Sequence, residues 1–158
     1  GANQPTPCRK SLQALTKVFI NQSYHISRGC HDRLTGLLNR RQLDEFMEHI
    51  FCDSLHQQRR KKLPIRCIAL LDIDHFKAIN DNYGHLFGDE VLINIANQMR
   101  YCFRQEDGVY RYGGEEFVVV LEYVSAEEAH VILDRFRQHI ESFDFPEKIK
   151  VTISIGYV

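Results

Sequence analysis

Two acids, Asp72 and Asp74, end a dense apolar run over residues 66–74. The run, RCIALLDID, is typical of a buried strand, and α/β sheets usually place their ligands at the carboxyl ends of strands. A carboxylate that is buried alone is costly, so such acids need a partner. We therefore expect this strand end to bind a group that accepts carboxylate oxygens as ligands.

A second acidic pair, Glu115 and Glu116, follows two glycines within the apolar stretch 109–122. We expect this stretch to form a β-hairpin with the glycines at its turn. If the hairpin pairs with the first strand, its tip can approach Asp72. Converging carboxylates indicate a hard divalent cation, Mg²⁺ or Mn²⁺.

Two interpretations of Gly113 and Gly114 stay open at this point. The double glycine can supply the positive φ of a tight turn and let a phosphate or another backbone segment come close. Alternatively, it forms an ordinary type I′ turn followed by solvated acids, because Gly-Gly turns are common. The first interpretation makes the turn part of a nucleotide or phosphate site, whereas the second gives it no chemical role.

A phosphate site is also indicated just after the first strand. Residues 72–76 lead into a helix whose free N–H groups can hold phosphate. Lys77 lies in the first turn of that helix, a poor place for a cation unless it meets an anion. The alternative is that Asn80 to Asp89 form a polar loop in which Asp89 caps the next helix. A loop explains the glycines of this segment but not Lys77.

Hydrophobic periodicity predicts the elements that position these residues. Helices are expected over about 40–59, through 92–103, and after a capping box at 125–128, with a last strand over 150–158. A lead-in helix, amphipathic or coiled-coil, is expected over 11–30. The order helix, strand, helix, hairpin, helix, strand predicts an α/β sandwich whose sheet contains antiparallel pairs. The predicted core-facing residues of the three helices are Leu43, Phe46, Met47, Ile50, Leu92, Ile95, Met99, Phe103, Ala129, Ile132, Leu133, Phe136 and Ile140.

The composition excludes several classes of protein. The chain of 158 residues is long enough for one domain with a substantial core. Its formal net charge of −1 provides no field for polyanions, so a general nucleic-acid binder is excluded. The five cysteines are odd in number and form no CxxC pair, which favours reduced structural thiols in the cytosol over disulfides or a zinc site. No apolar run approaches the ~20 residues that a membrane span needs.

The chain resembles the GGDEF domain of diguanylate cyclases over roughly residues 30–158. Four segments carry the resemblance in the family's order and spacing: DRLTGLLNRR (32–41), LDIDHFKAINDNYGHLFGDEVL (71–92), RYGGEEF (111–117) and VTISIGY (151–157). The second and third together are highly specific. The resemblance implies an α/β (α+β) fold: a central mixed, mainly antiparallel five-stranded sheet flanked by helices, as in nucleotidyl cyclases and the polymerase palm. It also implies that two GTP molecules are condensed into cyclic di-GMP with release of two pyrophosphates.

The resemblance assigns roles to the acids. Asp72, Glu115 and the carbonyl of Ile73 are implied as ligands of Mg²⁺ or Mn²⁺, and Glu116 is a second acidic candidate. Glu115 is implied to accept the proton of the 3′-hydroxyl that attacks the α-phosphate of the other GTP. The resemblance also implies catalytic roles for Glu116 and Lys77. Metal ions lower the pKa of that hydroxyl and neutralise the leaving pyrophosphate, which makes metal activation the larger effect.

The residues implied to bind the substrate are Phe76, Lys77, Asn80, Asp89, Gly113 and Gly114. Asn80 and Asp89 correspond to the guanine-binding pair of the family. A carboxylate can accept hydrogen bonds from both N1–H and the 2-amino group of guanine. Adenine lacks that pair of donors and would leave the carboxylate unpaired, at a cost of ~1–3 kcal/mol. Phe76 and Lys77 correspond to the phosphate-binding segment, through a backbone N–H and the ammonium group.

A product-inhibition site is also implied. Arg104 and Asp107 match the RxxD motif of that site, and Arg135 matches a further arginine of the same site. Arginine can bind phosphate or the acceptor edge of guanine bidentately, while the aspartate can accept from the guanine donors. Taken alone, Arg104 and Asp107 are equally well explained as an i,i+3 surface ion pair worth about a few tenths of a kcal/mol.

The resemblance finally implies partners and organisation. Residues 1–30 would form a linker or signalling helix that couples an upstream sensory domain to the cyclase domain at 31–158. A homodimer is implied, because the hydroxyl of one bound GTP attacks the phosphate of the other. The domain would be cytoplasmic, and any membrane anchor of the full protein would lie upstream.

Two departures from the family pattern matter for activity. GGEEF in place of GGDEF keeps the charge and does not put activity in doubt. The family's usual last helix carries a lysine and an arginine for the γ- and β-phosphates and has no counterpart before Val158. We therefore expect weak GTP binding and poor turnover from this chain alone.

Two other classes of function remain open. The chain could be a non-catalytic receptor for GTP or cyclic di-GMP, or a structural dimerisation module. The intact acids Asp72, Glu115 and Glu116 argue against a receptor, and the density of polar motifs argues against a purely structural role.

Overall fold

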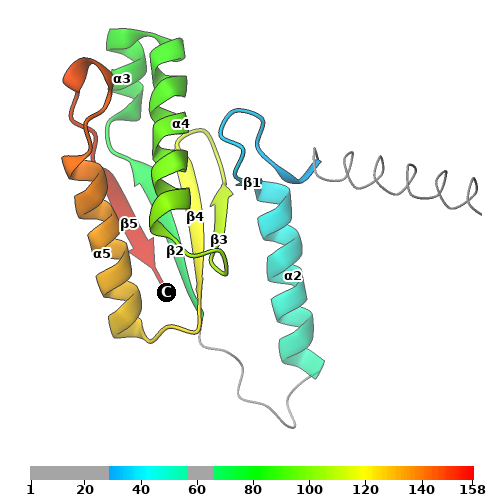
Figure 1. The fold of residues 1–158 in the computed structure, drawn as a ribbon. Helices are drawn as coiled ribbons and strands as arrows, with labels where there is room; N and C mark the ends of the chain where they lie inside the picture. Colours follow the sequence, from blue (N-terminus) through cyan, green and yellow to red (C-terminus); the bar gives the residue numbers. More distant parts are fainter. Residues whose placement is uncertain (1–28, 57–65) are drawn as a thin grey trace, which may run out of the picture.

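The structure, a computed structural model, describes residues 29–56 and 66–158 (Figure 1). The lead-in helix expected over 11–30 lies outside the described residues except at its last two positions. The expected end of the next helix at Arg59 also lies outside them. In the described part of the chain, no helix is both long and apolar enough to cross a membrane.

Five strands form one sheet in the order β1-β3-β4-β2-β5. β1 pairs with β3 in parallel, and the other neighbouring pairs are antiparallel. The mixed, mainly antiparallel five-stranded sheet is therefore confirmed. Hydrophobic periodicity did not predict β1, which has only two residues. The strands are β1 (Leu38–Asn39), β2 (Arg66–Ile73), β3 (Gly108–Arg111), β4 (Glu116–Glu122) and β5 (Ile153–Tyr157).

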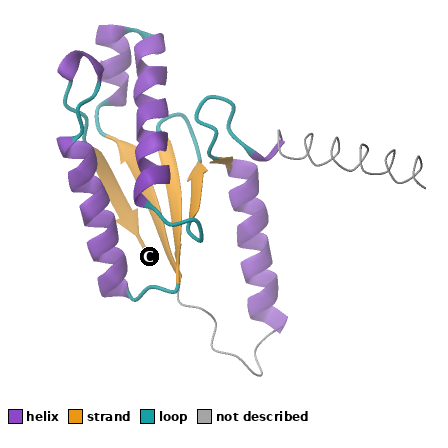
Figure 2. Cartoon of the chain, viewed as in Figure 1, coloured by secondary structure: helices purple, strands orange, loops and turns teal. Residues whose placement is uncertain are grey.

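Helices cover both faces of this sheet, as Figure 2 shows. Side chains alternate along β4: Phe117, Val119 and Leu121 enter the main core with α4 and α5, whereas Val118 and Val120 form a smaller core with α2. A strand that is buried on both faces has apolar residues at successive positions, which explains the VVVL segment at 118–121. The helices are α2 (Arg40–His56), α3 (Phe76–Tyr83), α4 (His85–Cys102) and α5 (Ala126–Ser142), followed by a 3₁₀ turn at Pro146–Lys148.

Most of the predicted core-facing residues are buried. The exceptions are half-buried, namely Phe46, Met47, Ile50 and Ile132. Phe103 is buried as predicted but lies one residue beyond the end of α4. The capping box of α5 is confirmed: the Ser125 hydroxyl accepts from the N–H of Glu128, whose carboxylate accepts from the N–H of Ser125.

The segment between the first strand and the hairpin differs from the prediction. It contains two helices, α3 and α4, separated by Gly84 with a φ of 87°. The loop interpretation of Asn80 to Asp89 is therefore wrong, because both residues are helical and Asp89 lies inside α4 rather than at its cap. Glycine at position 84 allows the left-handed backbone that ends one helix and starts the next.

The last strand is shorter than expected. β5 starts at Ile153 rather than at residue 150. Immediately before it, the carbonyl of Thr152 accepts a hydrogen bond from the N–H of Asp74, so the contact with β2 extends past the strand itself. Among the described residues, Cys30, Cys67 and Cys102 form no disulfide.

Candidate active site

The end of β2 meets the tip of the hairpin. Asp72 is the register partner of Glu116 in the antiparallel ladder between β2 and β4. Directly opposed residues of an antiparallel pair have their side chains on the same face of the sheet. The expected approach of the hairpin tip to Asp72 is therefore confirmed, and the two carboxylates lie on the face opposite to the main core.

Glu115 adds a third negative charge to this corner. Burial raises the pKa of Glu115, and the charges of Asp72 and Glu116 raise it further. Like charges that converge in this way destabilise one another unless a cation lies between them. The electrostatics of the corner are therefore those of a cation site.

The donor set fits a divalent ion that the substrate helps to bind. Among the described residues, no group of three or more His, Cys, Asp or Glu side chains is arranged to hold a metal by itself. Mg²⁺ in nucleotide sites is usually bound by one or two carboxylates together with phosphate oxygens and water. Asp72, Glu115 and the backbone oxygen of Ile73 are the residues that could supply such a partial set.

Asp74 does not join the other acids. Its two carboxylate oxygens accept hydrogen bonds from the hydroxyls of Thr152 and Ser154, each at 2.6 Å. These two bonds, from Ser154 and Thr152, hold the pKa of Asp74 below its ordinary value. Asp74 therefore fastens the start of β5 to the end of β2, a structural role that its place beside Asp72 did not reveal.

The turn between β2 and α3 is strained and uncapped. His75 has a left-handed backbone, with a φ of 58°, and its side chain makes no capping hydrogen bond to α3. Non-glycine residues adopt this conformation infrequently, and they do so preferentially at functional sites. Phe76 is buried as the first residue of α3, and Lys77 is exposed. Within the described residues, the first N–H groups of α3 are thus left without a side-chain partner, beside an exposed ammonium group.

Asn80 lies on the packing surface between α3 and α4. A Cβ atom at Gly88 would overlap the side-chain oxygen of Asn80 and crowd the ring of Phe76. Gly88 is buried, whereas Asn80 and Asp89 are half-buried. The absence of a side chain at position 88 thus lets the Asn80 amide lie directly against α4, next to the position of Asp89.

The backbone of the glycine loop, residues 112–115, has neither of the two turn conformations considered from the sequence. The positive-φ glycines in the described part of the chain are Gly36 and Gly84, so neither a type I′ turn nor a positive φ explains Gly113 and Gly114. The loop closes instead through the N–H groups of Tyr112 and Gly113, which both donate to the carbonyl of Glu116, at 2.9 and 3.2 Å.

The two glycines serve different purposes. A Cβ at Gly113 would lie 2.5 Å from the Oε2 atom of Glu116, so glycine leaves room for that carboxylate. A Cβ at Gly114 would meet no atom within 4 Å, and Gly114 is exposed. The loop therefore presents an open surface beside the acids, as the expectation of a close approach requires.

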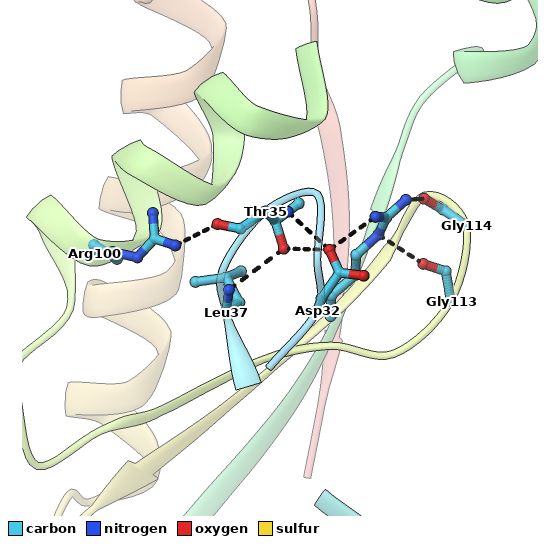
Figure 3. A network of polar contacts seen from close by, with 7 residues as sticks. Asp32, Thr35, Leu37, Arg100, Gly113 and Gly114 are labelled. Atoms are coloured by element: carbon cyan, nitrogen blue, oxygen red, sulfur yellow. Dashed lines mark hydrogen bonds and ion pairs between the residues drawn. The ribbon is translucent and has the colours of Figure 1, made fainter. Parts of the chain in front are cut away.

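Sequence reasoning missed the residues that hold this loop in place (Figure 3). Arg111 donates to the carbonyls of Gly113 and Gly114 and forms an ion pair with Asp32 at 2.9 Å. Thr35 donates two hydrogen bonds to the same Asp32 oxygen. Burial acts to raise the pKa of Asp32, but the bonds from Thr35 and Arg111 outweigh it and lower the pKa.

The residues of the implied inhibitory site lie at the end of α4 and on α5. Asp107 accepts from the backbone N–H of Arg104 at 2.9 Å, so the pair forms a turn rather than the side-chain ion pair considered from the sequence. The Arg104 side chain borders a surface hollow of about 380 Å³ that Tyr123 and Val131 also line. Arg135 is exposed on α5, and its charge counteracts the burial that raises the pKa of Cys102 near the end of α4.

Comparisons with known proteins identify relatives of this arrangement. The family model described as "Diguanylate cyclase, GGDEF domain" matches residues 30–158. Diguanylate cyclase A of Treponema denticola is 36% identical over 151 residues, which cover 93% of this chain and 40% of that protein. Diguanylate cyclase DgcP of Pseudomonas aeruginosa is 43% identical over 128 residues, which cover 79% of this chain and 18% of that protein.

A solved structure has the same fold. The coiled coil and GGDEF domain of DgcB from Caulobacter crescentus, in complex with c-di-GMP, matches with a TM-score of 0.81 at 24% sequence identity. The match covers 95% of this chain and 79% of that one. In contrast, the chain spans less than half of the length of the two curated relatives.

Proposed function

The chain belongs to the GGDEF family of diguanylate cyclase domains, and we propose that it condenses two GTP molecules into cyclic di-GMP with release of two pyrophosphates. The observation that carries this proposal is the pairing of Asp72 with Glu116, with Glu115 beside them, at the edge of an open glycine loop. Acids that repel one another next to a space for a ligand are expected where metal-bound phosphates react.

Asp72 and Glu115, with the carbonyl of Ile73, would hold Mg²⁺ or Mn²⁺, and Glu116 is a further oxygen donor. Bound there, a divalent ion would neutralise phosphate charge and lower the pKa of the attacking 3′-hydroxyl. Glu115 is the residue that would accept the hydroxyl proton. Its place beside Asp72, at the edge of the open loop, supports this role, because a general base must lie within hydrogen-bonding reach of the proton that it accepts.

The phosphates and the base would be held by α3 and α4. The uncapped start of α3, at Phe76, can donate its N–H groups to phosphate, and the exposed ammonium of Lys77 lies in the same turn. Asn80 and Asp89 would bind the guanine edge, with Asp89 accepting from its two donors. The close contact of the Asn80 amide with α4 at Gly88, one residue before Asp89, supports this proposal because it brings the two polar side chains to neighbouring positions.

The reaction requires two copies of the chain. Each bound GTP supplies one hydroxyl and one α-phosphate, and the ring closes only when two loaded sites face each other. Activity is therefore expected from a homodimer and should fall steeply on dilution. A domain of this kind would work in the cytoplasm, where GTP is available, under the control of a sensory domain upstream.

Cyclic di-GMP would also act as an inhibitor through Arg104, Asp107 and Arg135. The exposure of both arginines supports this proposal, since their guanidinium groups can reach phosphates or guanine acceptors. Replacing Arg104 with alanine should weaken inhibition by added cyclic di-GMP. An inhibition constant that stays the same would remove Arg104 from the site.

The test of the cyclase activity is incubation of the chain with GTP and Mg²⁺, followed by chromatography of the nucleotides. Cyclic di-GMP and pyrophosphate should appear, and EDTA should stop their formation. Asp72→Asn should abolish the product, whereas Glu122→Gln, at the far end of the same strand pair, should not. Because slow turnover is expected from this chain alone, a receptor is identified only if the full-length protein binds GTP or cyclic di-GMP without forming any product.

A further inference from the structure

One arginine holds both carbonyl groups of the glycine loop. The Nε atom of Arg111 donates to the carbonyl of Gly113 at 3.2 Å, and its Nη2 atom donates to that of Gly114 at 2.9 Å. Its remaining nitrogen, Nη1, lies 2.9 Å from the Oδ1 atom of Asp32. All three nitrogens of the guanidinium group are thus engaged, and the side chain is only 15% exposed.

These bonds fix the direction of two peptide N–H groups. In a trans peptide the C=O and N–H bonds point in opposite directions, and no cis peptide occurs in the described residues. With the carbonyls of Gly113 and Gly114 turned toward Arg111, the N–H groups of Gly114 and Glu115 point away from it. Neither N–H donates to another group of the protein in the described part of the chain. The surface above Gly114 is open.

We propose that Arg111 is a positioning residue that presents the N–H groups of Gly114 and Glu115 as a binding site for a phosphate group of the nucleotide. Successive backbone N–H groups that point the same way form an anion site. This inference rests on the proposed cyclase function, and it assigns the double glycine a role in binding. A phosphate beside Glu115 and Asp72 needs donors, because these acids alone would repel it.

The positive charge of Arg111 is already paired with the carboxylate of Asp32. Asp32 is itself held by the N–H and hydroxyl of Thr35, at 2.8 and 2.7 Å. The carbonyl of Thr35 in turn accepts from Arg100 of α4 (Figure 3). The ion pair is thus anchored from the side opposite to the loop. Arg111 acts on the nucleotide only through the two peptides that it orients.

The test uses Arg111→Lys, which keeps the charge and the partner Asp32. Lysine has one nitrogen and cannot hold two carbonyls and a carboxylate in one plane. The probes are 3′-deoxy-GTP, which cannot react, and guanosine, which has the base without phosphates, each titrated in Mg²⁺. The variant should bind 3′-deoxy-GTP about tenfold more weakly than the wild type, with guanosine affinity unchanged. Amide resonances of Gly114 and Glu115 should shift with 3′-deoxy-GTP in the wild type and lose that shift in the variant.

Arg66→Lys is the matched control. Arg66 forms a similar half-buried ion pair with Glu122, also at 2.9 Å, at the other end of the sheet. Replacing Arg66 should change neither the affinity for 3′-deoxy-GTP nor the affinity for guanosine. Two results for Arg111→Lys would overturn the inference: an equal loss of affinity for 3′-deoxy-GTP and for guanosine, or an unchanged affinity for 3′-deoxy-GTP. Neither result would affect the cyclase proposal. Failure of the wild type to bind 3′-deoxy-GTP at all would overturn both.

Discussion

The two ends of the ladder between β2 and β4 carry opposite arrangements of charge. At one end Arg66 faces Glu122, with the Nε and Oε1 atoms 2.9 Å apart. At the other end Asp72 faces Glu116, two acids, with Glu115 beside them. The cross-strand pair at the first end stabilises the sheet, whereas like charges directly opposite one another destabilise it. The same two strands thus end in an attractive pair on one side and, on the other, in acids that the proposed function pairs with a metal-bound nucleotide.

Asp72→Asn should have the largest effect, and in opposite directions on activity and stability. Loss of a ligand carboxylate should lower the rate of cyclic di-GMP formation at least about a hundredfold. Without metal, the free energy of unfolding should rise by up to about 1 kcal/mol, because one member of the like-charge pair is gone. Urea unfolding in EDTA and a nucleotide assay in Mg²⁺ measure the two quantities. A variant that is less stable yet active would contradict the contrast between the ends.

Gly113→Ala should affect the acidic end through its geometry. The added Cβ would come within 2.5 Å of the Glu116 Oε2 atom, so the flexible carboxylate has to move. We expect the rate to fall about tenfold, because small displacements of reacting groups are costly. The change in stability should stay below about 1 kcal/mol, since the obstacle is the end of a side chain. Gly114→Ala, whose Cβ enters open space, is the matched control for the stability measurement.

Asp74→Asn sharpens the comparison by removing a structural acid two residues from Asp72. Since the folded pKa of Asp74 lies below its ordinary value of 3.8, its ionised form stabilises the fold at neutral pH. The variant should lose about 0.5–1 kcal/mol at pH 7, because solvent screens the partly exposed carboxylate and its hydrogen bonds. The difference should shrink as the pH falls from about 5 through the folded pKa, where Asp74 becomes protonated. A difference that does not depend on pH would assign the loss to packing instead.

Glu115 should show the opposite pH dependence in the absence of metal. Its folded pKa is raised above the ordinary value of 4.5, so its ionised form destabilises the fold. This destabilisation is present above the folded pKa and is relieved as the pH falls through it toward 4.5. Glu115→Gln should therefore flatten that part of the profile, as urea unfolding in EDTA at several pH values would show.

Glu122→Gln should have the smallest effect. Removing the partner of Arg66 should cost about 1 kcal/mol of stability or less, since both side chains reach solvent. Cyclic di-GMP formation should not change, because the pair lies at the opposite end of the strand from the acids. Mg²⁺ with GTP should raise its melting temperature as much as that of the wild type. A large loss of activity here would break the division between the two ends.

The sequence alone predicted the elements whose signals are local. The apolar run of β2, the hairpin and the capping box at Ser125 all depend on residues that are neighbours in the chain. The meeting of Asp72 with the hairpin tip followed once the two strands were assumed to pair. β1 carried no such signal, because two residues cannot display a period.

Contacts between distant residues explain most of what was missed. Asp32 and Arg111 are separated by 79 positions, and no local pattern connects them. The role of Asp74 depends on the hydroxyls of Thr152, just before β5, and Ser154, within it, which are 78 and 80 positions away in the sequence. The backbone of Gly113 was misread because glycine was taken to mean positive φ, whereas here it makes room for a neighbouring carboxylate.

Under the proposed function, the contact between Gly88 and Asn80 links these two positions in any redesign of the base preference. Because any side chain at position 88 would collide with the amide at position 80, the two sites cannot be varied independently. In a library that randomises position 80 and keeps Gly88, the new side chains still have to fit the contact between α3 and α4. If Asn80 binds guanine as proposed, a substitution at Gly88 would also alter base binding, although Gly88 has no side chain with which to contact the base.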